Sequence, residues 1–143
     1  MADDIDEEAW LAERRKEVAA YLARERLEHG RIALDASWCV APYVSLWQIE
    51  SLKSPRRTGW WAICGDHPTD YISANDLYEP REVLRAIGER WLEVSSFMQR
   101  GIPHPTITIG SRANAKELGE LLRTRAELLI QWADDESVWE DAS

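Results

Sequence analysis

The stretch of the chain that decides the fold is residues 58–72, which read TGWWAICGDHPTDYI. Its first half has the aromatic and β-branched residues typical of a strand, and GDHP predicts a turn because glycine and proline interrupt regular structure. Residues 69–72 then predict a short further strand. Alternate side chains of a strand point to opposite faces, so Trp60 and Trp61 cannot share a face. One of these two tryptophans is therefore our candidate for an exposed or pocket-lining aromatic residue.

A second strand-like segment precedes this stretch. Residues 38–50 are also rich in aromatic and β-branched side chains, and the sequence at 53–57 predicts a hairpin loop, so the two segments should pair antiparallel. One face of the earlier segment ends in Gln48 and Glu50, and we expect that face to become polar toward the hairpin. Pro42 cannot donate a hydrogen bond to a neighbouring strand, which predicts a bulge or a sheet edge there.

Two segments flanking these strands have the apolar spacing of amphipathic helices. The first runs from about residue 6 to residue 27, and its end is expected at His29 and Gly30, with the glycine in a left-handed cap. The second has Pro80 near its first turn and Gly101 just past its end. Apolar side chains recur in it at every third or fourth position, which is the clearest helical pattern in the sequence.

A third helix is expected near the end of the chain. Asn114 and Glu117 have the spacing of a capping box, and the apolar stripe that follows extends to Trp132. Residues 106–110 alternate in polarity and predict a short fourth strand. The sequence thus predicts an α+β fold, in which three amphipathic helices pack on a small, mainly antiparallel sheet of three or four strands. We expect a single domain that spans residues 1–143.

The net charge of −9 is concentrated at the two ends of the chain. Residues 3–8 and 134–141 contribute ten acidic residues and no basic one, while residues 9–133 hold the other 16 acids and all 17 lysines and arginines. The body of the protein is therefore electrically balanced. The ends, 1–5 and 135–143, are expected to be acidic and frayed.

The composition also argues against several classes of partner and cofactor. Phosphate binding needs a patch of basic residues, and the group of Lys53, Arg56 and Arg57 is interpreted as a solvated turn, so we expect no nucleic-acid partner. No apolar stretch approaches the roughly 18 residues that cross a bilayer, and the start of the chain does not resemble a secretory signal. A cytoplasmic protein without a membrane partner is expected. Cys39 and Cys64 lack the spacing of a zinc or redox motif and predict reduced core thiols, with no metal or cofactor.

The turn in the 58–72 stretch carries the strongest candidate for a functional site. Asp66 or Asp70 could orient His67 as a general base, or the three could contribute to a divalent-metal shell with His104 as a distant partner. The alternative is that both aspartates bind backbone N–H groups of the turn, while Tyr71 packs in the sheet. Neighbouring residues point in different directions, so their proximity in the sequence does not by itself make a site.

Six short motifs carry a family resemblance: Ala41-Pro42-Tyr43-Val44-Ser45, Gly59-Trp60-Trp61, Gly65-Asp66, Pro68-Thr69-Asp70-Tyr71, Pro103-His104-Pro105 and Trp132-Ala133-Asp134-Asp135. In these motifs the sequence resembles an uncharacterised bacterial family of small stand-alone proteins, classed as a domain of unknown function. The resemblance covers nearly the whole chain. It implies a bacterial cytoplasmic protein and supplies no activity, cofactor or catalytic residue.

Two functions are consistent with these patterns. The first is a non-catalytic protein-binding module of immunity, inhibitor or adaptor type, which the small size, the acidic ends, the eight tryptophans and the absence of catalytic motifs favour. The second is a small-molecule-binding protein or small hydrolase, whose polar side chains would converge beside the turn under a tryptophan-lined wall. No catalytic residue is assigned. The candidate ligand- or partner-binding residues are Trp60, Trp61, Asp66, His67, Asp70, Tyr71 and His104.

Overall fold

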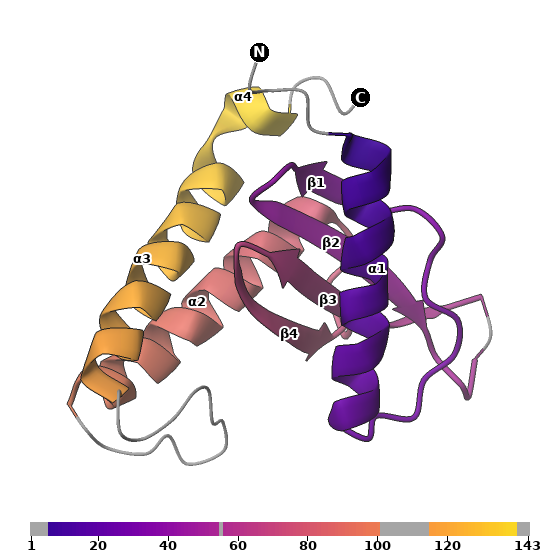
Figure 1. The fold of residues 1–143 in the computed structure, drawn as a ribbon, viewed down its shortest axis with the longest axis horizontal. Coiled ribbons are helices and arrows are strands. Elements are labelled where there is room, and N and C mark those ends of the chain that lie inside the picture. The colour runs from indigo at the N-terminus through magenta and orange to yellow at the C-terminus, as the bar shows by residue number, and fades with distance from the viewer. Residues whose placement is uncertain (1–5, 55, 101–114, 140–143) are drawn as a thin grey trace. The chain divides into compact units, whose positions relative to one another are not determined.

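The computed structural model describes residues 6–54, 56–100 and 115–139, and the chain divides into two compact units, 1–80 and 81–143. The α+β class predicted from the sequence is confirmed. Within the described ranges, no helix is both long enough and apolar enough to cross a membrane. The elements, labelled in Figure 1, are α1 (Glu7–Arg24), β1 (Trp38–Val40), β2 (Val44–Glu50), β3 (Thr58–Gly65) and β4 (His67–Ser73) in the first unit, and α2 (Pro80–Gln99), α3 (Ala115–Asp134) and α4 (Glu136–Trp139) after them.

The first unit contains a four-stranded antiparallel sheet in the order β1-β2-β3-β4. The long strand expected at 38–50 is two strands joined by a tight turn, in which the Tyr43 amide donates to the Val40 carbonyl at 2.7 Å. Pro42 lies in this turn rather than at a bulge or an edge. Proline has no N–H group, and it fits here because a residue in the turn does not need to donate a hydrogen bond to a neighbouring strand. The strand expected at 69–72 begins earlier, at His67.

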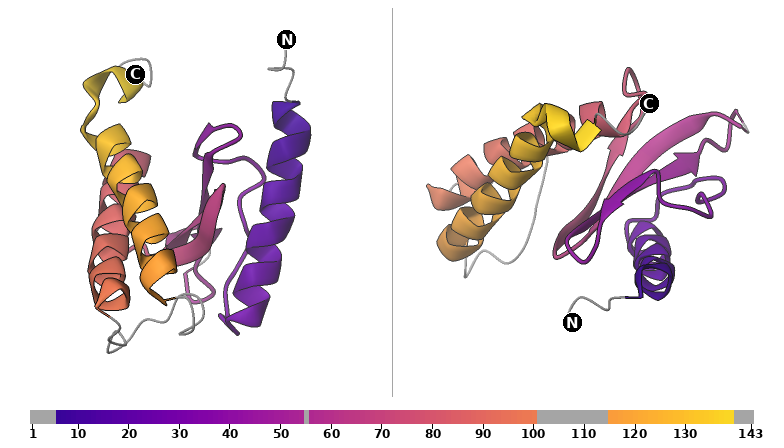
Figure 2. Two further views of the ribbon diagram at one scale, coloured as in Figure 1. Left: turned by 60° about the vertical axis from the view of Figure 1, so that its left-hand side comes forward. Right: turned by 90° about the horizontal axis from the view of Figure 1, so that it is seen from above.

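Helix α1 covers one face of this sheet, as the two views in Figure 2 show. Asp6 caps the helix, and its carboxylate accepts a hydrogen bond from the Ala9 amide at 3.1 Å. The buried side chains of the helix, Val18 and Leu22, pack in the core against the sheet face that carries Trp47 and three further buried strand residues. This arrangement places the apolar stripe of the helix on the alternating apolar side chains of the strands.

Helix α1 ends three residues earlier than its sequence suggested. The last helical residue is Arg24, and Arg26 adopts the left-handed conformation with φ of 56°. The amides of Arg26 and Leu27 bind the carbonyls of Ala23 and Leu22, which is the hydrogen-bond pattern of a Schellman cap. The expected left-handed cap at Gly30 is therefore wrong, because Arg26 already ends the helix.

Gly30 instead lets the following segment, residues 30–33, approach strand β2. A Cβ atom on Gly30 would lie only 3.0 Å from the Glu50 carbonyl oxygen. The Gly30 amide donates to that carbonyl at 2.8 Å, and Ile32 forms an isolated antiparallel bridge with Ile49. The segment thus extends the sheet beside the second half of β2, where β1 does not reach.

Two antiparallel helices, α2 and α3, make up most of the second unit (Figure 1). The second predicted helix is confirmed, with Pro80 at its start and its end before Gly101. The helices approach closely at Gly88, where an added Cβ would lie 2.7 Å from the Ile130 side chain. Asn114 of the expected capping box and the strand expected at 106–110 lie outside the described residues.

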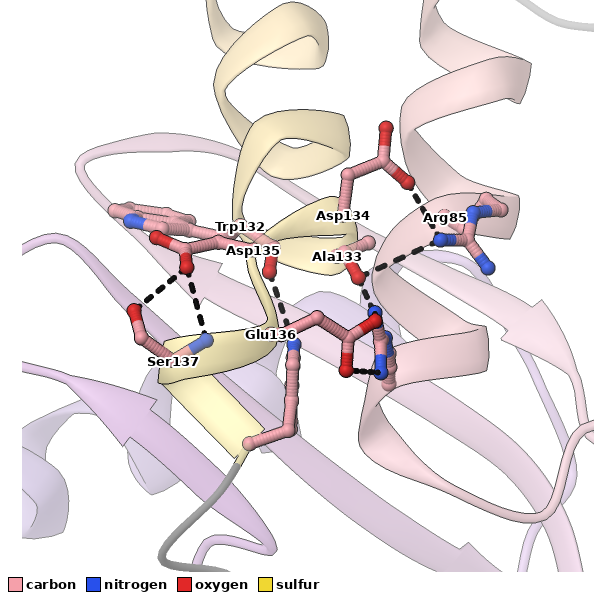
Figure 3. A network of polar contacts seen from close by, with 9 residues as sticks. Arg85, Trp132, Ala133, Asp134, Asp135, Glu136 and Ser137 are labelled. Atoms are coloured by element: carbon pink, nitrogen blue, oxygen red, sulfur yellow. Dashed lines mark hydrogen bonds and ion pairs between the residues drawn. The ribbon is translucent and has the colours of Figure 1, made fainter.

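The short helix α4 follows the end of α3, and the sequence did not predict it. Figure 3 shows Arg85 reaching both the Ala133 carbonyl and the Asp134 carboxylate at this end. Arg81 donates to the same carbonyl at 2.6 Å and pairs with Glu136 at 2.8 Å. The negative charges at the end of α3 are therefore bound by arginines from the first turns of α2.

Candidate functional site

The predicted turn between β3 and β4 is a very tight one, with Asp66 as the single residue between the strands. The Asp66 amide donates to the Tyr43 carbonyl at 2.9 Å, while its side chain is exposed. Gly65 has φ of 155°, and a Cβ atom there would collide with the same carbonyl oxygen. The backbone of His67 belongs to β4, whereas its side chain and the whole of His104 lie outside what the structure describes.

Asp70 lies in the edge strand β4, where it pairs with Ile63 and so belongs to the sheet face opposite α1. It is 6% exposed, and its carboxylate accepts hydrogen bonds from the Tyr71 amide at 2.8 Å and the Tyr21 hydroxyl at 3.4 Å. Burial, together with the nearby Asp70 carboxylate, raises the pKa of Tyr21 above its ordinary value. Tyr71 packs edge-on against Tyr21, with ring centroids 6.0 Å apart. These contacts are those of residues that help to pack the first unit.

The tryptophan pair occupies both faces of β3. Trp60 packs against the core under α1, whereas Trp61 lies on the opposite face and is 1% exposed. The Trp61 indole donates to the Leu77 carbonyl at 3.1 Å and forms part of the wall of a hollow. The described candidates therefore lie at three separate places: the face under α1, the opposite face and the exposed turn. They do not converge on one pocket.

A row of polar and sulfur-containing side chains lies under α1. Cys39 pairs with Ser45 across β1 and β2, and Ser45 pairs with Cys64 across β2 and β3. The Cys64 thiol donates to the Glu17 carboxylate at 2.8 Å, and burial raises its pKa to about 12. Burial and the neighbouring Glu7 raise the pKa of Cys39 to about 11. Because the thiolate is the nucleophilic form, neither cysteine is activated for covalent chemistry at neutral pH.

A different part of the first unit gathers charged groups around a hollow. It lies on the sheet face opposite α1, near the β2–β3 hairpin, and has a volume of about 280 Å³. We call it the arginine hollow. Residues 30–33 form one side, β2 forms the floor and the start of β3 with its preceding loop forms the other side. Its lining residues are Arg31, Ala33, Gln48, Glu50, Arg56, Arg57 and Thr58.

A larger hollow adjoins the first and shares three of its lining residues, Gln48, Arg57 and Thr58. Its volume is about 770 Å³, and its remaining wall consists of Trp61 and the turn at 74–78 after β4. The side chain of Tyr78 in that turn is 76% exposed. We call this second space the tyrosine hollow. Together the two hollows form an open depression, which we call the groove, at the end of β3 far from the Asp66 turn.

The arginine hollow carries an excess of positive charge in a chain that is acidic overall. Arg31, Arg56 and Arg57 face a single carboxylate, that of Glu50. Within the described part of the chain, none of these three arginines forms an ion pair or a side-chain hydrogen bond. Guanidinium groups bind carboxylates and phosphates through paired N–H donors, so three of them around one depression have the chemistry needed to bind an anion.

The backbone at the groove is also unusual. The described residues contain three non-glycine positions with positive φ, and two of them, Arg56 at 78° and Asp76 at 62°, line the groove. A left-handed conformation costs a non-glycine residue roughly 1–2 kcal/mol, with aspartate more tolerant than arginine. Arginine at position 56 is therefore not explained by the conformation of its loop.

Sequence reasoning did not identify this site. It interpreted Lys53, Arg56 and Arg57 as a solvated turn and did not consider Arg31, which lies 25 residues before Arg56 in the chain. The one signal in the sequence was the polar end of β2, where Gln48 was expected on a face that becomes polar toward the hairpin. Gln48 lines both hollows, and its amide donates to Thr58 at 3.2 Å.

No group of three or more side chains that could bind a metal ion together occurs among the residues that the structure describes. One family model matches the chain, and it does so over residues 4–139. No protein with a curated description and no solved structure matches.

Proposed function

The chain belongs to the family of this match, "Domain of unknown function (DUF4826)", and because that description assigns no activity, we propose from the groove that the protein is a non-catalytic protein-binding module. The observation that carries the proposal is a set of three arginines, which form no ion pair with any residue that the structure describes, beside an exposed tyrosine. Arginine and tyrosine are enriched among the residues that contribute most to protein–protein binding.

The character of the groove supports a protein partner over a small molecule. Small-molecule pockets are mostly apolar and enclose most of the ligand's surface. The arginine hollow has one apolar lining residue, Ala33, and the groove is open to solvent. A protein surface can cover an open and polar depression of this kind, with the arginines at its centre.

The geometry of the turn residues gives no comparable support to hydrolysis. Asp70 is bonded into the packing of the first unit, and Cys64 is held as a protonated thiol. The groove lies at the other end of β3 from Asp66. The two hollows of the groove therefore do not support the alternative of a hydrolase at this turn.

The proposal is tested by placing a photo-crosslinking amino acid at position 78 and irradiating cells of the source organism. We expect one discrete protein adduct, and the same crosslinker at Ala20, an exposed position on α1, should not give it. The adduct should disappear when Arg57→Glu is added. The captured protein, purified separately, should bind the wild-type chain and not the Arg57→Glu variant in calorimetry.

Two results would contradict a binding module at the groove. The first is a set of adducts that is the same from positions 78 and 20, since such adducts report collisions only. The second is a captured protein that binds wild-type and Arg57→Glu chains with equal affinity when both are purified. A folded Arg57→Glu variant is required, and its circular dichroism spectrum and urea midpoint provide that control.

A further inference from the structure

The register of the first unit places two of the arginines on either side of β2. The Glu50 amide donates to the Arg31 carbonyl at 2.9 Å on one edge of the strand. On the other edge, the Ser51 amide donates to the Arg57 carbonyl, also at 2.9 Å. Neighbouring strands are about 4.8 Å apart, so the backbones of Arg31 and Arg57 are separated by roughly 10 Å, with Glu50 between them.

One carboxylate cannot neutralise three guanidinium groups that lie around it. Glu50 lies in the same hollow as Arg31, Arg56 and Arg57, yet none of the three forms an ion pair within the described residues. A ligand that brings two or more carboxylates could bind arginines on both sides of Glu50, with paired hydrogen bonds to each guanidinium. The distance across the hollow suits carboxylates on different residues of one peptide segment.

We propose that the arginine hollow binds an acidic segment of the partner protein, whose carboxylates pair with Arg31, Arg56 and Arg57. This inference rests on the proposed binding function and specifies the chemistry of the partner. Tyr78 in the adjoining hollow supplies an exposed aromatic surface for the residues that follow the acidic ones.

A nucleic acid fits the same surface less well. The chain has a net charge of −9, and Glu50 and Asp76 place two carboxylates in the groove itself. Both features would repel an extended polyphosphate. Its binding also depends on a continuous run of basic residues, which the two carboxylates interrupt. A short acidic peptide needs only the local positive charge of the arginine hollow.

Because the backbone of Arg56 is left-handed, a substitution at this position can distinguish a binding role of the side chain from a structural one. Glycine adopts φ of 78° without strain, so Arg56→Gly should leave the urea midpoint unchanged or raise it. If the side chain binds the partner, the same variant should bind an acidic ligand less tightly. A merely structural residue would not produce this combination of equal or higher stability and weaker binding.

The experiment uses the full chain and a fluorescein-labelled peptide, Gly-Glu-Ser-Glu-Ser-Glu-Gly, with fluorescence anisotropy at 50 mM NaCl. We expect a dissociation constant below about 1 mM, weakened about tenfold when glutamine replaces the glutamates. Arg31→Gln and Arg57→Gln should each weaken binding by roughly 5- to 20-fold. The control Lys16→Gln removes the same charge from the exposed surface of α1 and should change the affinity by less than about twofold.

Four results would overturn the acidic-segment proposal. They are equal binding of the glutamate and glutamine peptides, equal effects of the Lys16 and Arg57 variants, tighter binding of an oligothymidylate of matched charge, and Arg57-dependent self-association in sedimentation equilibrium. The last would make a second copy of this chain, with its acidic ends, the occupant. A crosslinked partner that contacts the groove through residues without carboxylates would reject this inference and leave the binding module intact. If the glutamate peptide binds selectively but crosslinking captures no partner, the binding module is rejected and the anion site is retained.

Discussion

The side chain of Arg15 is the point at which the construction of the arginine hollow is best tested. This α1 residue reaches over to the segment 30–33, where its Nε donates to the Ala33 carbonyl at 2.8 Å and its Nη2 to the Ile32 carbonyl at 2.7 Å. The segment is also bonded to β2 through the amides of Gly30, Ala33 and Glu50, around the bridge pair of Ile32 and Ile49. Arg15→Ala removes the two bonds from α1 and should therefore loosen the segment that positions Arg31.

The magnitude follows from the two hydrogen bonds. Each bond from a charged donor contributes about 1.5–3 kcal/mol, and both are partly buried, so water replaces some of what is lost. We expect the free energy of unfolding to fall by roughly 2–4 kcal/mol. At a urea m value of about 2 kcal/mol/M, the midpoint should fall by roughly 1–2 M. The urea midpoint of Arg15→Lys should lie between those of wild type and Arg15→Ala, because an ammonium group lacks the planar, forked donors of a guanidinium group.

The assay combines urea unfolding with amide hydrogen exchange. The amides of Gly30, Ala33 and Glu50, which bond the segment to β2, should exchange faster in Arg15→Ala, while the amides of β3 change only with global stability. Lys16→Ala provides the control, since among the described residues Lys16 pairs only with Glu13, at an exposed position. A midpoint within about 0.3 M of wild type, with these three amides still protected, would refute this account of how the segment is held.

Three further predictions concern other parts of the structure. Gly65→Ala should lower the free energy of unfolding by roughly 2–4 kcal/mol, because its Cβ would collide with the Tyr43 carbonyl; an unchanged urea midpoint would contradict this. The pKa of Cys64 is raised from 9.0 to about 12, so the unfolded thiol ionises first. The contribution of this thiol to stability should therefore be constant below pH 9 and fall above it by up to ~1.4 kcal/mol per pH unit. Cys64→Ser should reduce that slope, and equal slopes would exclude the thiol as its source. Arg81→Ala should lower the free energy of unfolding by about 1–3 kcal/mol through loss of its bond to the Ala133 carbonyl, which a melting temperature equal to wild type would contradict.

The elements with strong local patterns were predictable. The β3 strand was recognisable from its aromatic run, and the period of apolar residues between 83 and 98 located α2. These patterns survive in the structure because each reflects burial of one face of an element. Boundaries were less certain: a left-handed arginine at position 26 ended α1, where Gly30 had been expected to do so, since tertiary contacts can impose φ values that a residue does not prefer.

The candidate site could be predicted only in part, because it depends on pairing between distant segments. The polar face at the end of β2 follows from alternation within one strand, and Gln48 was expected on that face, although it was not among the candidate site residues. Arg31 lines the same hollow because Ile32 pairs with Ile49, and no local sequence pattern predicts this pairing. The aspartates of the β3–β4 turn attracted attention because they are close in sequence, yet Asp70 is 6% exposed and bonded to its neighbours.

The register of the segment 30–33 decides whether the arginine hollow exists at all. Ile32 is 7% exposed and packs in the core under α1, so its neighbours Arg31 and Ala33 must point to the opposite face, where both line the hollow. A slip of one residue would place the Arg31 guanidinium under α1 and expose Ile32, at the cost of an unpaired buried charge and a lost apolar contact. Burial of one isoleucine therefore both secures the segment and directs Arg31 toward Arg57. Ile32→Ser, which weakens that preference, should reduce acidic-peptide binding even though Ile32 does not line the hollow.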